Sequence, residues 1–413
     1  MCKNSVESKY NNLIASARAQ TRYEFGPQDR VYVSLIEALY KSALDPYDDI
    51  SIVERTTANW IKHVIENSEK DFPFSEYIEN LKKNIEINRR QHLLVVPLEG
   101  SQCSADIISE SFRVLTGTPD QKIKKLVELS GITPEEGNYF ADHTERNKTP
   151  GFFSQSLLVL TQRAHTSTVR FRAPNLVRLV MYTIRMYYLG HVRGTTRDPT
   201  PRFRIRSMAD FAIEKTDGTT IAIWSDEYYS FSHEYTRDKI DFCFDLDFIS
   251  NGRPTIEAFI SSVVLNINRS DFNSKMLNAL FLANKAFQLE RGMEPNISLL
   301  VLISAIESLL CENKGEKKLR FSSLLPRFAG TNKSDIGPTA RNLSILYNSR
   351  NKFVHAAEEE ILDHLIPEDS IRPLILVSQL MGRLIFLNFD PKNNKTLEEW
   401  NRETNEVFEG LVY

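Results

Sequence analysis

The stretch NISLLVLISAIESLL, residues 296–310, decides the fold of the C-terminal third of this chain. Its apolar residues recur with the 3.6-residue period of a helix that buries a wide stripe. Similar helical patterns lie on both sides, at 276–287, 319–325, 343–349 and 372–388. The region from residue 266 to 413 is therefore predicted to be an all-α helical bundle.

The segment RNKFVH, from Arg350 to His355, follows directly on one of these helical patterns. An imidazole titrates near neutral pH, so His355 can accept a proton from a ribose 2′-hydroxyl or donate one to a departing 5′-oxygen. The guanidinium of Arg350 stays charged and suits the additional negative charge on a five-coordinate phosphorus. Together these residue types can cleave RNA, but not DNA, without a metal and leave a 2′,3′-cyclic phosphate.

The spacing of this pair restricts how such a site is built. On a straight helix, Arg350 and His355 are about 140° apart around the axis and about 7.5 Å apart along it, so they do not share a face. Asn351 and His355, at i and i+4, do share one, and Asn351 can hold the imidazole in one orientation. The pair converges on a phosphate if the helix ends between the two residues or if a second copy contributes. We expect the second arrangement, a two-fold dimer.

These helices and this motif resemble the HEPN domain, specifically its Apea-like branch, over about residues 270 to 395. The resemblance rests on SAIESLL, residues 304–310, and on a Tyr-Asn-x-Arg-Asn-x-x-x-His segment from Tyr347 to His355. It implies a HEPN-like bundle that dimerises and forms a metal-independent ribonuclease site at its interface from Arg350 and His355, with Asn351 as the polar residue of the motif in a supporting role. It also implies a setting in prokaryotic antiviral defence or toxin-mediated growth arrest.

Two alternatives stay open around this resemblance. Glu307 lies within the apolar stretch and needs a partner if it is buried. The resemblance suggests that Glu307 pairs with Arg350 or Asn351 and orients the site, whereas the alternative is a solvent-facing acid between two apolar stripes. For the domain, the alternative to an endoribonuclease is a module that dimerises or binds RNA in a defence or regulatory complex without catalysis.

Residues 1–265 show mixed α and β patterns, so the whole chain is expected to be an α+β protein. This region is interpreted as a sensing or substrate-recognition region, mainly helical over residues 1–90. Helices are expected at 31–44, 51–69, 75–88, about 121–130 and 175–190, and strands at 92–97, 168–172, 219–224 and 241–248. The sequence NGRP at 251–254 is expected to interrupt the chain before the helical domain.

Arginine is concentrated between residues 163 and 206, where the only acid is Asp198 and aromatic residues are interleaved. Guanidinium groups contact phosphates and aromatic rings stack on bases. On a strand, Arg170 and Arg172 share one face, as do Arg202, Arg204 and Arg206, which makes these five residues candidates for RNA binding. The alternative is that they pair with acidic clusters such as Asp48-Asp49 or Asp226-Glu227.

The composition argues against an overall basic surface, a metal site and a nucleotide cofactor. A net charge of −3 gives no overall basic character, so any RNA binding must be local. The four cysteines form no CxxC pair, and no two histidines have the spacing of metal ligands. The sequence also has no Gly-rich loop of the kind that binds phosphate. Asp241, Asp245 and Asp247 are interpreted as the polar outer face of a strand rather than as metal ligands. We therefore expect neither a metal nor a cofactor.

The expected location and partners follow from the same sequence. The N-terminus lacks an apolar signal core, and no apolar run approaches the length of a membrane span. A cytoplasmic protein without a membrane partner is predicted. Its expected partners are RNA, a second copy of the chain through the HEPN-like domain, and a phage-derived or other protein trigger.

Overall fold

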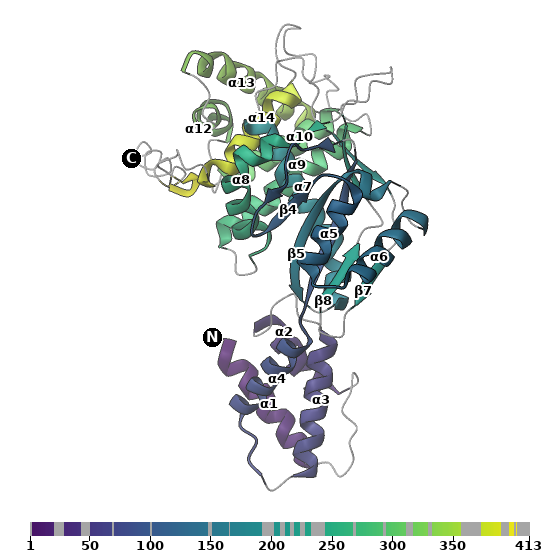
Figure 1. Cartoon of the computed structure of the whole chain (residues 1–413). Coiled ribbons are helices and arrows are strands. Elements are labelled where there is room, and N and C mark those ends of the chain that lie inside the picture. The colour runs from purple at the N-terminus through teal and green to yellow at the C-terminus, as the bar shows by residue number, and fades with distance from the viewer. Residues whose placement is uncertain are drawn as a thin grey trace, which may run out of the picture.

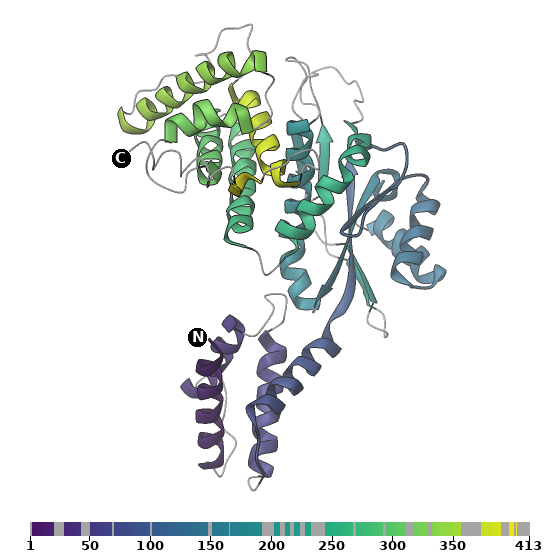
Figure 2. The ribbon, with the colours of Figure 1, turned by 90° about the vertical axis from the view of Figure 1, so that its left-hand side faces the viewer.

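The chain folds as an α+β protein in the computed structural model (Figure 1). The structure describes residues 2–19, 29–42, 50–67, 70–99, 101–147, 151–164, 166–191, 202–206, 211–214, 219–223, 228–232, 244–266, 270–291, 295–310, 317–328, 333–356, 373–389, 396–399 and 402. A helical unit lies at one end of the molecule, a mixed sheet lies in the middle, and the C-terminal helices lie at the other end (Figures 1 and 2).

Among its described residues, the N-terminal unit has four helices around a core of its own: α1 (Cys2–Ala19), α2 (Arg30–Ser42), α3 (Ile50–Glu66) and α4 (Phe74–Asn88). The predictions at 31–44, 51–69 and 75–88 are confirmed by α2, α3 and α4 over their described parts. Aromatic residues occupy the centre of this core, where the rings of Tyr10 and Tyr77 stack at 5.0 Å. The unit joins the sheet where α4 ends and β1 (Arg90–Glu99) begins.

Strand β1 is central to a sheet with eight strands in the described part of the chain. It pairs antiparallel with β5 (Ser156–Ala164) on one side and parallel with β8 (Thr219–Ile223) and β9 (Tyr228–Ser232) on the other. The remaining strands of the sheet are β3 (Ile107–Ile108), β4 (Phe112–Leu115), β6 (Arg202–Arg206) and β7 (Phe211–Glu214). Short strands β2 (Ser101–Gln102) and β10 (Phe244–Asp245) pair separately. The strands predicted at 92–97 and 219–224 are confirmed by β1 and β8.

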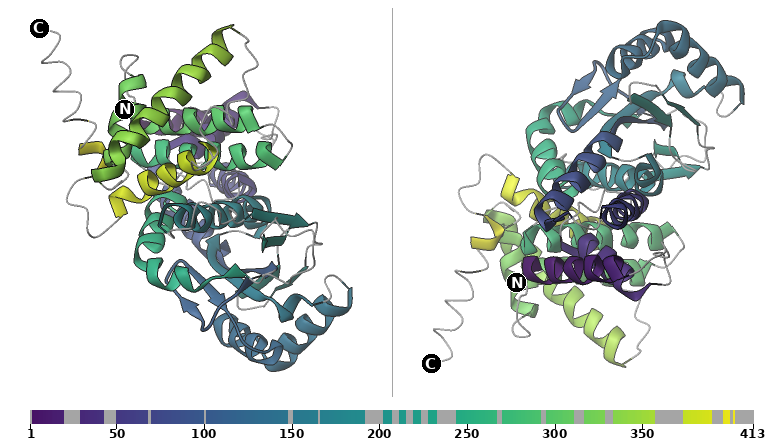
Figure 3. Two further views of the ribbon diagram at one scale, coloured as in Figure 1. Left: turned by 90° about the horizontal axis from the view of Figure 1, so that it is seen from above. Right: turned by 90° about the horizontal axis from the view of Figure 1, so that it is seen from below.

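Both faces of β1 are buried, as its continuous apolar run predicts. Leu93 and Val95 share a core with the helices α5 (Pro119–Ser130) and α6 (Pro134–Asn147) and the short helix η1 (Phe152–Ser154). Leu94 and Val96 face the opposite way, into a larger core that includes α7 (Thr166–His191). Figure 3 shows the resulting layers, in which α7 lies between the sheet and the C-terminal helices.

The C-terminal helices continue the larger core. They are α8 (Asp247–Phe259), η2 (Ile260–Val264), α9 (Asp271–Arg291), α10 (Pro295–Leu310), α11 (Lys317–Leu319), η3 (Arg320–Leu324), α12 (Leu325–Phe328), α13 (Lys333–Ala356), α14 (Pro373–Phe386) and η5 (Leu387–Phe389). The helical patterns of this region are confirmed. One cluster of buried residues extends from Leu94 in the sheet to Leu397, so a shared core crosses the predicted boundary at residue 265.

Two local predictions are wrong. The segment 168–172 is helical, within α7, because the apolar stripe that continues to Leu189 extends a long helix through this short alternating run. The segment 251–254 lies inside α8 and does not interrupt the chain. Gly252 is needed there because a Cβ would collide with the ring of Tyr187, and Ile256 and Phe259 anchor the helix in the core.

The predicted strand at 241–248 is much shorter where the structure describes it. Only Phe244–Asp245 is a strand, and Asp247 begins α8, so Asp245 and Asp247 do not share a strand face. The carboxylate of Asp247 accepts a hydrogen bond from the backbone N–H of Ser104 at 2.8 Å. Asp241 lies outside the described residues. Among the described helices, none is both long enough and apolar enough to cross a membrane.

Candidate functional site

The candidate site lies where α10 and α13 meet. Glu307 projects from α10 among core residues and is only 8% exposed. Tyr347, Arg350 and Asn351 lie on α13, at i, i+3 and i+4, so one face of that helix presents all three. Leu343 and Leu346 bury the preceding turn of α13 in the core, which fixes the register of this face relative to α10.

Glu307 binds two donors from α13, one at each carboxylate oxygen. The hydroxyl of Tyr347 donates to Oε1 at 2.8 Å, and Nη2 of Arg350 lies 3.5 Å from Oε2. The phenol contact is a buried hydrogen bond to a charged acceptor, and the longer contact is an ion pair with little access to solvent. Of the two open interpretations of Glu307, the structure supports the one that pairs it with Arg350.

Arg350 is held from three sides. Besides the contact with Glu307, Nη1 donates to Oδ1 of Asn351 at 3.0 Å, and the guanidinium carbon lies 5.7 Å from the centre of the Tyr347 ring. The Arg350 side chain is 19% exposed. Its Nε is buried and has no hydrogen-bond partner within the described part of the chain.

Tyr347 has no role of its own among the residues expected from the sequence, although its hydroxyl makes the shortest contact of Glu307 in the structure. Phe321, in the π-helical turn η3, packs against the Tyr347 ring at 5.6 Å between centroids and supports its position. The sequence signal for this role was weak. Only the i, i+3 spacing between Tyr347 and Arg350 indicates that both reach the same neighbour.

His355 lies on α13, which runs without a break from Lys333 to Ala356. The helix therefore does not end between Arg350 and His355, and that option is excluded. The two residues remain about 140° apart around one helix axis. The side chain of His355 lies outside the described residues. Of the two arrangements that the sequence allows, the one that remains takes Arg350 and His355 from two copies of the chain.

Comparisons with protein-family models, curated proteins and solved structures find no match. The HEPN resemblance therefore rests on the residues quoted from this sequence. Across the described part of the chain, no group of three or more His, Cys, Asp and Glu side chains is arranged to hold a metal ion.

The candidate RNA-binding arginines fall on two different elements. Arg170 and Arg172 lie on helix α7, two residues and therefore about 200° apart, so the prediction that they share a strand face is wrong. Arg202, Arg204 and Arg206 do occupy alternate positions of a strand, β6, opposite Ser232, Ser230 and Tyr228 of β9. The side chains of all five arginines, and the acidic clusters at 48–49 and 226–227, lie outside the described residues.

Proposed function

We propose that this protein is a metal-independent endoribonuclease of the HEPN type that acts as a dimer, in prokaryotic antiviral defence or toxin-mediated growth arrest. One observation carries the proposal. A buried carboxylate, Glu307, holds the guanidinium of Arg350, whose side chain remains 19% exposed. A fixed cation that is still partly exposed suits an anion whose charge grows during the reaction.

In the proposed reaction, the ribose 2′-oxygen attacks the adjacent phosphorus while the bond from phosphorus to the 5′-oxygen breaks. His355 accepts the proton of the 2′-hydroxyl or donates a proton to the departing 5′-oxygen. Arg350 stabilises the charge on the five-coordinate phosphorus. The products are a 2′,3′-cyclic phosphate and a 5′-hydroxyl end.

Three residues position this pair. Glu307, on α10, contacts Arg350 directly, and Tyr347, on α13, holds Glu307 through its hydroxyl and lies under the guanidinium of Arg350. Asn351 accepts from Arg350 through Oδ1, which leaves its Nδ2 donors for a group one turn later on the helix, where His355 lies. Because α13 is continuous, we place the working Arg350 and His355 on different subunits of a two-fold dimer.

The test is cleavage of total RNA by purified protein in excess EDTA, with detection of new cyclic-phosphate ends. We expect the wild type to cleave. Arg350→Ala and His355→Ala should each lower the rate at least about 100-fold, the usual effect of losing a charge-stabilising donor or a general acid or base. Arg341→Ala, which removes an exposed arginine from the same helix, is the matched control and should cleave normally.

One observation favours a second candidate function, an RNA-binding or dimerising module without catalysis. Arg350 already contacts Glu307 and Asn351, and its side chain is mostly buried. In that case the wild type would bind RNA but produce no cyclic-phosphate ends, and Arg350→Ala would weaken binding only. Equal cleavage by the wild type and both alanine variants would refute the proposed site.

A further inference from the structure

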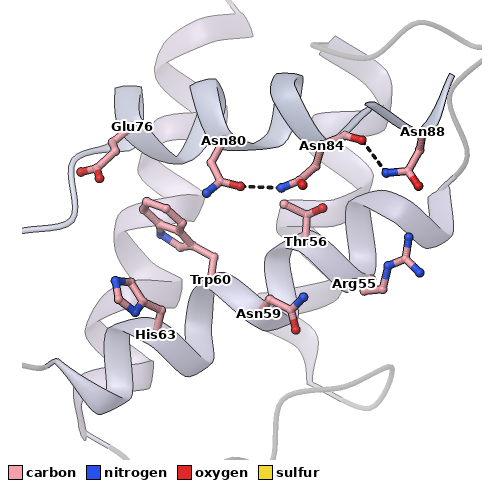
Figure 4. Close-up of a pocket in the computed structure, with 9 residues that line it drawn as sticks. All are labelled: Arg55, Thr56, Asn59, Trp60, His63, Glu76, Asn80, Asn84 and Asn88. Carbon is pink, nitrogen blue, oxygen red and sulfur yellow. Dashed lines mark hydrogen bonds between the residues drawn. The ribbon is translucent and has the colours of Figure 1, made fainter. Parts of the chain in front are cut away.

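A polar groove of about 310 Å³ lies between α3 and α4, in the N-terminal helical unit. Figure 4 shows the side chains that line it. They are Arg55, Thr56, Asn59, Trp60, His63, Glu76, Asn80, Asn84 and Asn88. The groove lies on elements that the proposed ribonuclease site does not use.

Two rows of polar side chains form its walls. The α3 row is Arg55, Asn59 and His63, and the α4 row is Glu76, Asn80, Asn84 and Asn88. Within each row the spacing is four residues, so the members lie one above another on a helix face. The rows run in opposite directions, with Arg55 near Asn88 and His63 near the Glu76 end (Figure 4). The groove therefore has a cationic end and an anionic end.

The floor between the rows is tied into the core by hydrogen bonds. Trp60 is buried, and its Nε1 donates to the hydroxyl of Tyr10 at 3.0 Å. Burial raises the pKa of Tyr10 to about 12, so the phenol stays protonated and donates in turn to the carbonyl of Phe72 at 2.9 Å. The polar atom of Trp60 is thus used inside the core, and ligand recognition falls to the side chains of the walls.

The asparagines offer both donors and acceptors to the groove. Asn84 donates to Oδ1 of Asn80 at 2.6 Å, and Asn88 donates to the backbone carbonyl of Asn84 at 2.7 Å. These bonds orient the amides of the α4 row. As far as the described residues go, the Asn80 Nδ2, the Asn84 Oδ1 and the whole amide of Asn59 make no hydrogen bond. An amide side chain carries the same donor and acceptor pair as a peptide group.

The charges disfavour a nucleic acid as the ligand. Helix α3 has two basic and two acidic residues, with histidine taken as neutral, and α4 has two basic and three acidic ones. Nucleic-acid binding depends on neutralising several phosphates with a cluster of cations. A ligand rich in neutral amides, with one group of each charge, fits this groove better.

We propose that the groove binds a short peptide segment in an extended conformation. Its main-chain amides contact Asn59, Asn80 and Asn84, an acidic group lies at Arg55, and a basic group lies at Glu76. The α4 row spans twelve residues, or about 18 Å, which is the length of about five extended residues. This peptide site goes beyond the proposed ribonuclease activity and does not depend on it.

The test is a binding titration of the full chain with three blocked pentapeptides, Lys-Ala-Ala-Ala-Glu, Lys-Ala-Ala-Ala-Lys and Glu-Ala-Ala-Ala-Glu. We expect the first to bind about fivefold more tightly than the other two, because an opposite charge replaces a like charge at one end. Glu76→Lys should shift the preference to the diacidic peptide, and Arg55→Glu should shift it to the dibasic one.

A double variant, Asn80→Ala with Asn84→Ala, tests the main-chain contacts. It should weaken all three peptides about tenfold, whereas Asn12→Ala, a change at an exposed asparagine of α1, should leave binding unchanged. An unchanged thermal unfolding midpoint would show that the variants still fold. Equal affinity for the three peptides overturns the proposal, as does absence of binding at millimolar peptide. Binding of a uridine decanucleotide in place of the peptides, lost in the double variant, also overturns it.

Discussion

At the scale of single residues, the geometry of the site depends on the carboxylate of Glu307. Burying a charged group costs free energy unless donors replace the lost water. Here Tyr347 replaces water at one oxygen and Arg350 replaces it at the other. The same two contacts restrict Arg350 to one position, so the stability of this part of the core and the orientation of the proposed reactive group are coupled.

This coupling predicts the effect of Tyr347→Phe. The change leaves a buried carboxylate oxygen without its donor, and we expect the free energy of unfolding to fall by about 1–3 kcal/mol. Urea denaturation measures it. Tyr139→Phe is the control, because Tyr139 lies on α6 and is 63% exposed. That variant should lose less than about 0.5 kcal/mol of its free energy of unfolding.

If Tyr347 also positions Arg350, the folded Tyr347→Phe variant should cleave RNA more slowly at saturating substrate. Its affinity for RNA should change little. This split separates positioning from simple destabilisation. A variant with full stability and full cleavage would contradict the role assigned to Tyr347.

At the scale of elements, helices α7 and α14 connect the sheet to the C-terminal bundle. Their backbones approach closely at Gly190 and Gly382, where a Cβ on Gly190 would lie 2.6 Å from backbone atoms of Gly382 and Arg383. Arg383 also donates from Nε to the carbonyl of Gly190 at 2.9 Å. Glycine is required here by the distance between two helices and not by a turn.

Gly190→Ala should therefore destabilise the protein by about 1–3 kcal/mol, because a methyl group would force two packed backbones apart. Gly337→Ala is the matched control on α13, where nothing lies within 4 Å of the added Cβ. Since alanine favours a helix, that change should stabilise the protein by about 0.4–1 kcal/mol. Thermal or urea unfolding of both variants distinguishes the effects, and similar losses in the two would contradict the close approach.

The elements also show what the sequence can predict. Long periodic runs such as 296–310 and the apolar run at 92–97 are decided locally, and both were predicted with the right type. The segment 251–254 has the composition of a turn and becomes a helix because distant residues, above all Tyr187, pack on it. The contact between Tyr347 and Glu307 depends on the relative position of two helices, which no local pattern contains.

At the scale of the whole molecule, the unbroken α13 is the reason why we assign the proposed site to two chains. A mixed dimer can be prepared by co-expressing Arg350→Ala and His355→Ala subunits with different affinity tags and purifying through both. Such a dimer retains one Arg350 and one His355 on different subunits. We expect it to regain about half of the wild-type cleavage rate, since one of two equivalent pairs is intact.

Dimers of each single variant, purified in the same way, are the controls and should be inactive. A mixed dimer as inactive as they are, beside an active wild type, would show that both residues must come from one chain. That outcome would refute the arrangement in two subunits while leaving the two residues as candidates.

The separate core of α1–α4 has a consequence for the time course of synthesis. Because this unit packs on its own aromatic centre, it can fold on the ribosome as soon as its last helix has emerged. Translation proceeds at about 5–20 residues per second, so the 262 residues from Asn88 to Arg350 take roughly 13 to 52 seconds to follow. The nascent chain thus presents its polar groove to the cell well before the residues of the proposed ribonuclease site have been synthesised.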